Sequence, residues 1–88
     1  MEYKESLLEF PCTFPLKAIG KNTESFERYV KWVVRDHVPG LDEDAFSRRT
    51  SRGDKYVSVS VTFMAESRSQ VDSIYTALSK HEHVILLL

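Results

Sequence analysis

The sequence has one cysteine, three glycines and no long hydrophobic run, and these shortages exclude several classes of protein. Cys12 alone permits neither a disulfide within the chain nor a multi-cysteine metal site, which fits a reducing compartment. Residues 1–5 are charged and do not resemble a secretory leader. No apolar run approaches the roughly 20 residues of a membrane span. We therefore expect a cytoplasmic protein that does not interact with membranes.

An excess of charge of either sign is also missing. Twelve Lys and Arg and 13 Asp and Glu leave a formal net charge of −1. No overall field therefore attracts the chain to nucleic acid or to an anionic membrane. What the sequence does have is a hydrophobic fraction of 42%, spread at regular intervals over 88 residues. This composition predicts one small packed domain.

Apolar residues recur with the periods of strands and helices in alternation. The predicted elements are a strand over 13–19, a helix over 24–37, a polar edge strand over 44–51, a strand over 55–65, a helix after the Ser67-x-x-Gln70 capping box, and a strand over 84–88. Each helix has a single apolar stripe, and the strand over 55–65 has a single apolar face. Both helices are therefore expected on the same face of a four-stranded antiparallel sheet, in a ferredoxin-like βαββαβ two-layer α+β sandwich. Residues 1–11 are interpreted as an N-terminal arm and 12–88 as the domain.

The loop from Gly20 to Thr23 is the first candidate binding site. It leads into a helix N-terminus, where exposed N–H groups and the helix dipole favour an anion such as a carboxylate. Lys17 or Lys21 would add positive charge, and Asn22 lies within the same loop. The alternative is an ordinary capped turn, in which Gly20 only relieves backbone strain.

A group of basic residues on the predicted hairpin is the second candidate site. Arg48, Arg49, Arg52 and Lys55 would bind an anionic partner, either a protein or a nucleotide. The alternative is a charged edge strand, since basic residues at an edge resist sheet-to-sheet aggregation.

The last strand is apolar on both faces, including Val84 and Leu86, and it lies at an edge of the expected sheet. Long apolar edges are normally paired, covered or charged. One predicted partner is a second copy of the chain, because most soluble oligomers are symmetric homo-oligomers. The other is the arm over residues 1–10, through Leu7, Leu8 and Phe10.

The histidines and the cysteine do not predict a metal site or a catalytic centre. His81 and His83 have no set of further ligands nearby in the sequence, whereas zinc sites gather three or four. His37 is expected at the negative end of a helix. Cys12 has no neighbouring histidine to activate it. No Ser/His/Asp or Cys/His spacing indicates an enzyme.

Several segments together resemble the YbeD-like family of short bacterial proteins, which have an ACT-like fold. The matching pieces include Leu8-Glu9-Phe10-Pro11, Lys17-Ala18-Ile19-Gly20, Tyr56-Val57-Ser58-Val59-Ser60-Val61-Thr62, Gln70-Val71 and Ile74-Tyr75. The resemblance implies an ACT-like domain without an established activity. ACT domains often bind amino acids or other small effectors where two copies meet, and this family is linked by gene neighbourhood to lipoate attachment. The Asp-x-Pro-Gly start of amino-acid-binding ACT domains is absent here.

The sequence therefore predicts a non-catalytic regulatory or adaptor module that needs no cofactor. Its expected partner is a small effector or a partner enzyme, with a second copy of the chain as a further candidate. Two alternatives come from other classes. An RNA-binding ferredoxin-like domain would stack bases on sheet aromatics, but the open face of the strand over 55–65 shows mainly Ser58, Ser60 and Thr62. A small hydrolase would need a phosphate-binding Gly-rich loop, which the sequence lacks.

Overall fold

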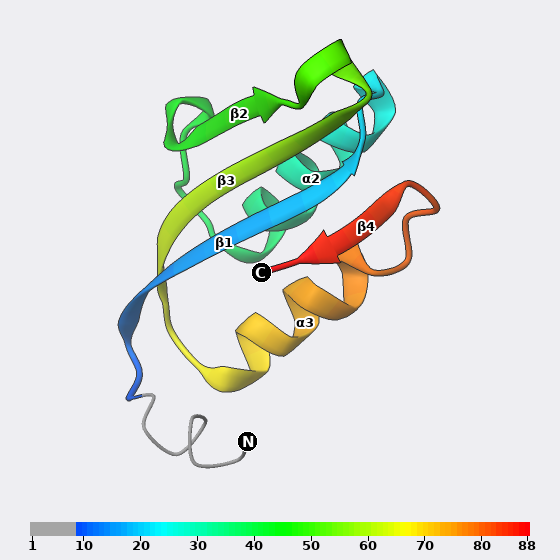
Figure 1. Cartoon of the computed structure of the whole chain (residues 1–88). Helices are drawn as coiled ribbons and strands as arrows, with labels where there is room; N and C mark the ends of the chain where they lie inside the picture. Colours follow the sequence, from blue (N-terminus) through cyan, green and yellow to red (C-terminus); the bar gives the residue numbers. More distant parts are fainter. Residues whose placement is uncertain (1–8) are drawn as a thin grey trace.

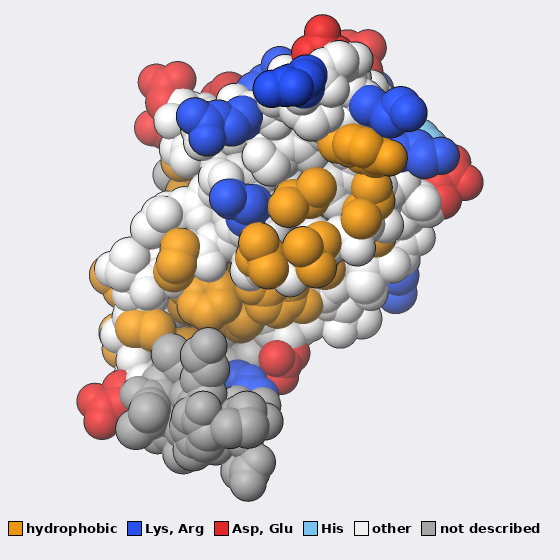
Figure 2. All heavy atoms as spheres, viewed as in Figure 1, with side chains coloured by type: hydrophobic (Ala, Val, Ile, Leu, Met, Phe, Trp, Pro, Cys, Tyr) orange, Lys and Arg blue, Asp and Glu red, His pale blue; other side chains and the backbone are white. Residues whose placement is uncertain are grey.

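The computed structural model describes residues 9–88, which form a sheet of four strands covered on one face by two helices (Figure 1). The elements are β1 (Cys12–Lys21), α2 (Glu24–His37), the 3₁₀ turn η1 (Glu43–Ala45), β2 (Phe46–Thr50), the 3₁₀ turn η2 (Arg52–Asp54), β3 (Tyr56–Ala65), α3 (Arg68–Leu78) and β4 (Val84–Leu87). The strand order is β2-β3-β1-β4, and all neighbours are antiparallel. Within residues 9–88, no helix covers the other face of the sheet (Figure 1). This face, which is turned toward the viewer in Figure 2, is named the open face below. The predicted ferredoxin-like arrangement is confirmed.

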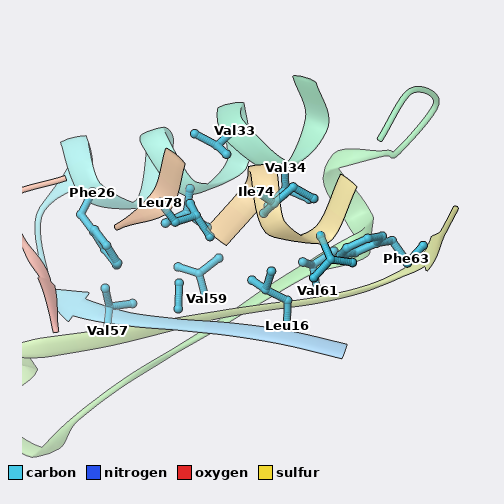
Figure 3. Packing of buried hydrophobic residues seen from close by; sticks show 14 residues of the cluster. Leu16, Phe26, Val33, Val34, Val57, Val59, Val61, Phe63, Ile74 and Leu78 are labelled. Carbon is cyan, nitrogen blue, oxygen red and sulfur yellow. The ribbon is translucent and has the colours of Figure 1, made fainter. Parts of the chain in front are cut away.

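The core lies between the sheet and the helices. β1 and β3 pair along ten residues, from Cys12 opposite Ala65 to Lys21 opposite Tyr56. Because side chains alternate along a strand, every second residue of each points at the helices. The buried hydrophobic residues of the sheet are Leu16, Ala18, Val57, Val59, Val61, Phe63 and Ala65 (Figure 3). They meet the apolar stripes of α2 and α3, which include Phe26 and Ile74.

Helix α2 has the predicted bounds because its ends carry clear signals. Thr23 caps the first turn, where its Oγ1 accepts a hydrogen bond from the Phe26 N–H at 3.1 Å. Beyond the helix, Gly40 adopts a φ of 84°, which suits glycine after a helix end. His37 lies in the last turn, as expected, with its Nδ1 2.8 Å from the Val33 carbonyl oxygen.

Helix α3 begins with a capping arrangement that differs from the predicted box. Ser67 Oγ accepts from the Gln70 N–H at 3.1 Å, as predicted. Gln70 Oε1, however, accepts from the Glu66 N–H at 2.7 Å rather than from that of Ser67. Gln70 Nε2 donates to the His37 carbonyl oxygen at 2.8 Å. The same side chain therefore ties the start of α3 to the end of α2.

Two predicted boundaries are wrong. The strand predicted over 13–19 continues through Lys21, so Gly20 belongs to β1 and not to a loop. A Cβ at Gly20 would lie 2.6 Å from the His83 carbonyl oxygen and 2.6 Å from Phe26 Cζ. Glycine is required there by close packing, not by backbone strain. The polar strand predicted over 44–51 is shorter, because η1 takes up its start and β2 begins at Phe46.

The predicted arm over 1–11 falls largely outside the described residues, and so do Leu7 and Leu8. Of the arm residues proposed to cover β4, only Phe10 is described, and it packs against the edge of the core. Within residues 9–88, neither helix has the length and apolar character needed to cross a bilayer.

Candidate functional site

Apolar side chains gather on the open face where β1 and β4 meet (Figure 2). Ile19 pairs with Leu86, and Lys17 and Leu88 exchange two backbone hydrogen bonds of 3.1 and 2.8 Å. This register places Ile19, Leu86 and Leu88 on the same face. Leu86 is 48% exposed, and Leu88 and the neighbouring Ile85 are 57% and 55% exposed. These four residues are named the apolar strip.

Three cations flank the apolar strip. Lys17, Lys21 and Arg49 occupy outward positions of β1 and β2, and all are exposed. Strand spacing of about 4.8 Å and a rise of about 3.3 Å per residue put their Cα atoms roughly 12–13 Å apart. Their side chains form no hydrogen bond or ion pair with another residue in the described part of the chain.

The strands carry no acidic side chain at any outward position within residues 9–88. The outward residues are Thr13, Pro15, Lys17, Ile19, Lys21, Ser47, Arg49, Tyr56, Ser58, Ser60, Thr62, Met64, Leu86 and Leu88. Acidic side chains lie only around the margin of this view (Figure 2). The open face is therefore basic although the whole chain has a net charge of −1.

The edge of the sheet is formed by β4 and, beyond β4, by the first residues of β1. These two parts of the edge differ in their ability to accept another strand. Because Leu88 bonds to Lys17, strand alternation points the N–H and C=O of Leu87 away from β1. Further along, residues 12–16 of β1 pair with β3 but extend beyond β4. Pro15 lacks an N–H in that stretch, which disfavours strand addition there.

The structure separates the residues of the predicted anion-binding loop. Lys17 and Lys21 point to the open face, whereas Gly20 is buried beneath it. Asn22 Nδ2 donates to the Asp54 carbonyl oxygen at 3.0 Å. Thr23 Oγ1 caps α2 and also lies 3.0 Å from His83 Nδ1. The structure therefore does not bring the side chains of all five residues together.

The predicted arginine cluster is also divided. Side chains alternate along β2, so Arg48 points toward the helices and Arg49 toward the open face. Arg48 Nε lies 2.9 Å from Glu27 Oε1, and its Nη2 donates to Asn22 Oδ1 at 3.3 Å. Arg52 lies in the exposed turn η2. Lys55 is exposed between η2 and β3. Of these four residues, Arg49 is the one at an outward strand position.

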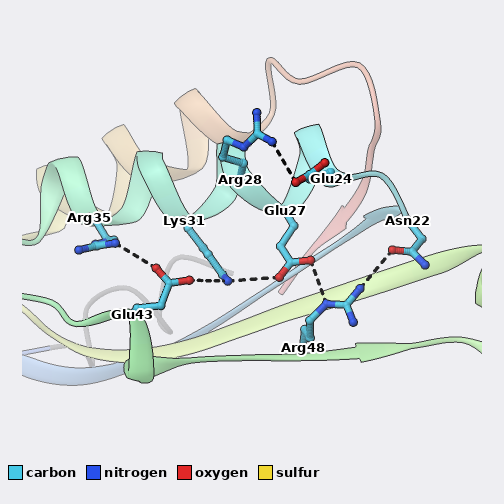
Figure 4. A network of polar contacts seen from close by, with 8 residues as sticks. All are labelled: Asn22, Glu24, Glu27, Arg28, Lys31, Arg35, Glu43 and Arg48. Carbon is cyan, nitrogen blue, oxygen red and sulfur yellow. Dashed lines mark hydrogen bonds and ion pairs between the residues drawn. The ribbon is translucent and has the colours of Figure 1, made fainter.

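Charged residues on the helix side form a continuous network (Figure 4). Lys31 Nζ lies 3.2 Å from Glu27 and 2.8 Å from Glu43, and Arg35 lies 3.1 Å from Glu43. The hydrogen bond that Lys31 donates to Glu43 raises the pKa of Lys31, although burial opposes this shift, and it lowers the pKa of Glu43. With Arg48, this network joins α2 to η1 and β2.

Trp32 stands on the outer face of α2 in a groove bordered by residues 40–43. Its side chain is 62% exposed, and its ring centroid lies 6.1 Å from that of Tyr29. The charged side chains of this groove include the paired residues Lys31, Arg35 and Glu43.

His81 and His83 come together in the turn before β4, with ring centroids 5.2 Å apart. The His81 ring also packs 5.6 Å from Phe26 and 4.9 Å from Tyr29. The sequence did not predict this packing, because it depends on a turn that returns the chain to α2. Across residues 9–88, no group of three or more His, Cys, Asp and Glu side chains could hold a metal ion.

Comparison with known proteins places this geometry in a family. The chain is 41% identical over 85 residues to the UPF0250 protein NE1487 of Nitrosomonas europaea, covering 97% of this chain and 98% of the relative. A UPF0250 protein of Neisseria gonorrhoeae is 41% identical over 87 residues, covering 99% and 96%. The solution structure of HP0495 from H. pylori matches the fold with a TM-score of 0.69 at 20% identity, covering 92% of this chain and 85% of that one. The family model "Protein of unknown function (DUF493)" matches residues 5–88, so the chain belongs to this family of short bacterial proteins, as the YbeD-like resemblance indicated.

Proposed function

We propose that the protein is a non-catalytic adaptor or regulatory module that binds a partner protein through the open face of its sheet. The observation that carries this proposal is the apolar strip, where Ile85, Leu86 and Leu88 are each about half exposed. An apolar patch bordered by polar residues is typical of an interaction surface. The strip lies on two strands that are hydrogen-bonded to each other, so a partner would meet a surface held by the sheet.

The ionisable groups support a binding role rather than catalysis. The pKa of Lys31 is raised and that of Glu43 is lowered because these two residues pair with each other, and burial raises the pKa of Tyr75. The Tyr75 hydroxyl donates to the Leu88 carbonyl oxygen at 3.0 Å and so helps to hold the last strand. Each shift thus has a structural cause, whereas catalytic groups are commonly shifted within a cleft.

The finer predictions from the sequence belong to this proposal. We expect a cytoplasmic location. We also expect a link to lipoate attachment, because the family resemblance implies one. A small effector is a less favoured occupant, since Asn22 and Thr23 of the predicted loop already bind other groups of the chain. RNA is less favoured too, because Tyr56 is the single aromatic side chain at the outward positions of the described strands.

In-cell photo-cross-linking tests the proposal. A photoreactive amino acid replaces Thr62, which is exposed on the open face, or Thr76, which is exposed on α3. The two positions match in residue type and differ in the layer they occupy. We expect a discrete protein adduct from position 62 and none of the same mass from position 76. Equal labelling from both positions, or no protein adduct from position 62, would contradict the proposal.

A further inference from the structure

We infer that the partner presents an acidic, amphipathic segment, most simply a helix, to the open face; this inference rests on the proposed function. The carrying observation is the combination of the apolar strip with three cations and no acidic side chain at an outward position of the described strands. A surface of this kind is complementary to carboxylates that flank apolar side chains.

The spacing of the three cations defines the spacing of acidic residues that a partner segment would need. The Cα atoms of Lys17, Lys21 and Arg49 lie roughly 12–13 Å apart, with Ile19 between the two lysines. Two turns of an α-helix rise about 11 Å, so acidic residues seven positions apart on a helix would reach two of these cations. Apolar residues three or four positions along would then face Ile19 and Leu86.

Basic residues on the helix side form ion pairs within the chain, and this distinguishes them from Lys17, Lys21 and Arg49. On the helix side, Lys31, Arg35 and Arg48 each lie within 3.2 Å of a carboxylate oxygen of Glu27 or Glu43. Those cations are already neutralised inside the chain. Lys17, Lys21 and Arg49 have no such carboxylate among residues 9–88, so a partner's carboxylates would add ion pairs without breaking any.

The same charges argue against other occupants of this face. A second copy stacked on the open face would bring three cations against three cations, which repel one another. The open face carries only these three cations among neutral residues such as Ser58, Ser60 and Thr62 of β3. Binding to an anionic membrane grows with the number of basic residues, so three cations favour a membrane only weakly. A second copy, lipid and RNA are therefore outcomes of the test that would overturn the inference.

The test repeats cross-linking from position 62 in the double variant Lys17→Glu/Arg49→Glu. Lys80→Glu, in the turn after α3, is the matched charge reversal in the helix layer. We expect the protein adduct to fall at least tenfold in the double variant and to persist in Lys80→Glu. The cross-linked segment of the partner, mapped by mass spectrometry, should contain at least two acidic residues among apolar ones. Thermal unfolding of each purified variant checks that the fold is retained.

A second variant keeps the inference and the proposed function distinguishable. Leu86→Ser removes apolar contact but leaves every cation in place, and it should also abolish the adduct. If Leu86→Ser abolishes the adduct while Lys17→Glu/Arg49→Glu does not, or if the mapped segment is basic or uncharged, the inference is wrong and the proposed function stands. An adduct to RNA, to lipid or to a second copy also overturns the inference. The absence of any protein adduct from position 62, in the chain that carries no further substitution, overturns the proposed function itself.

Discussion

The helix side and the open face of the sheet use the same basic residue types in opposite ways. Arg28, Lys31, Arg35 and Arg48 on the helix side each lie within 3.2 Å of a carboxylate oxygen. The cations of the open face have no acidic partner within residues 9–88. Surface ion pairs stabilise a fold by only about 0–1 kcal/mol each. The helix-side network therefore mainly orients α2 against β2, whereas the cations of the open face remain unpaired within residues 9–88.

The apolar residues of the two regions show the same contrast, and it gives the largest predicted effect. Ile74 of α3 is fully buried between the helices and the sheet, and Ile85 is 55% exposed beside the open face. Ile74→Ala should lower the free energy of unfolding by about 2–5 kcal/mol, because it leaves a cavity in the core. Ile85→Ala should change it by less than about 0.5 kcal/mol. Urea denaturation measures both, and similar losses in the two variants would contradict the assignment of Ile85 to a binding surface.

Gly20 tests how tightly the underside of the sheet is packed. Gly20→Ala should cost about 1–3 kcal/mol of unfolding free energy, because its Cβ would lie 2.6 Å from a backbone oxygen and from the Phe26 ring. Ser58→Ala, one position away across the β1–β3 pair and on the open face, should stay within about 0.5 kcal/mol. Chemical denaturation of the two variants measures the change in the free energy of unfolding for each. A Gly20→Ala protein as stable as the parent would show that the close approach of His83 and Phe26 is readily relaxed.

Removing charge from each side sharpens the electrostatic comparison. Glu27→Gln should cost about 0.5–1 kcal/mol, because Glu27 pairs with Lys31 and Arg48 and its side chain is only 19% exposed. Lys17→Gln should leave stability unchanged in the purified protein. The cost of Glu27→Gln should shrink in high salt, where ion pairs are screened. Thermal unfolding at low and high salt provides the measurement, and a stability loss for Lys17→Gln equal to that for Glu27→Gln would remove the contrast.

The smallest predicted effect is the pH dependence of the helix-side network. Lys31 lowers the pKa of Glu43 in the folded protein below its unfolded value. The pairing therefore stabilises the fold fully above the unfolded pKa of the carboxyl, and this contribution is lost as the pH falls through the lower folded pKa. Acidification across that window should destabilise the parent slightly more than Glu43→Gln. Parallel unfolding midpoints over the same pH series would contradict this assignment.

Much of the fold could be predicted from local patterns, while much of the site could not. The bounds of α2 and the buried face of β3 follow from periodicity and capping within a few residues of sequence. The role of Gly20 depends on His83, 63 positions away, and no local signal reports that contact. The predicted strand over 44–51 already placed Arg48 and Arg49 on opposite faces, but which of them points to the open face depended on the register with β3. The absence of carboxylates from the open face required the register of all four strands.

The most direct test of the account is the reactivity of individual lysines toward an amine-acylating reagent, in the purified protein and in intact cells. Lys17 and Lys21 should react readily in the purified protein and become protected in cells, where the partner covers the open face. Lys80 should react in both settings, and the ion-paired Lys31 should react slowly in both. Labelling of Lys17 and Lys21 that is as fast in cells as in the purified protein, relative to Lys80, would contradict the central claim that the open face is a binding surface.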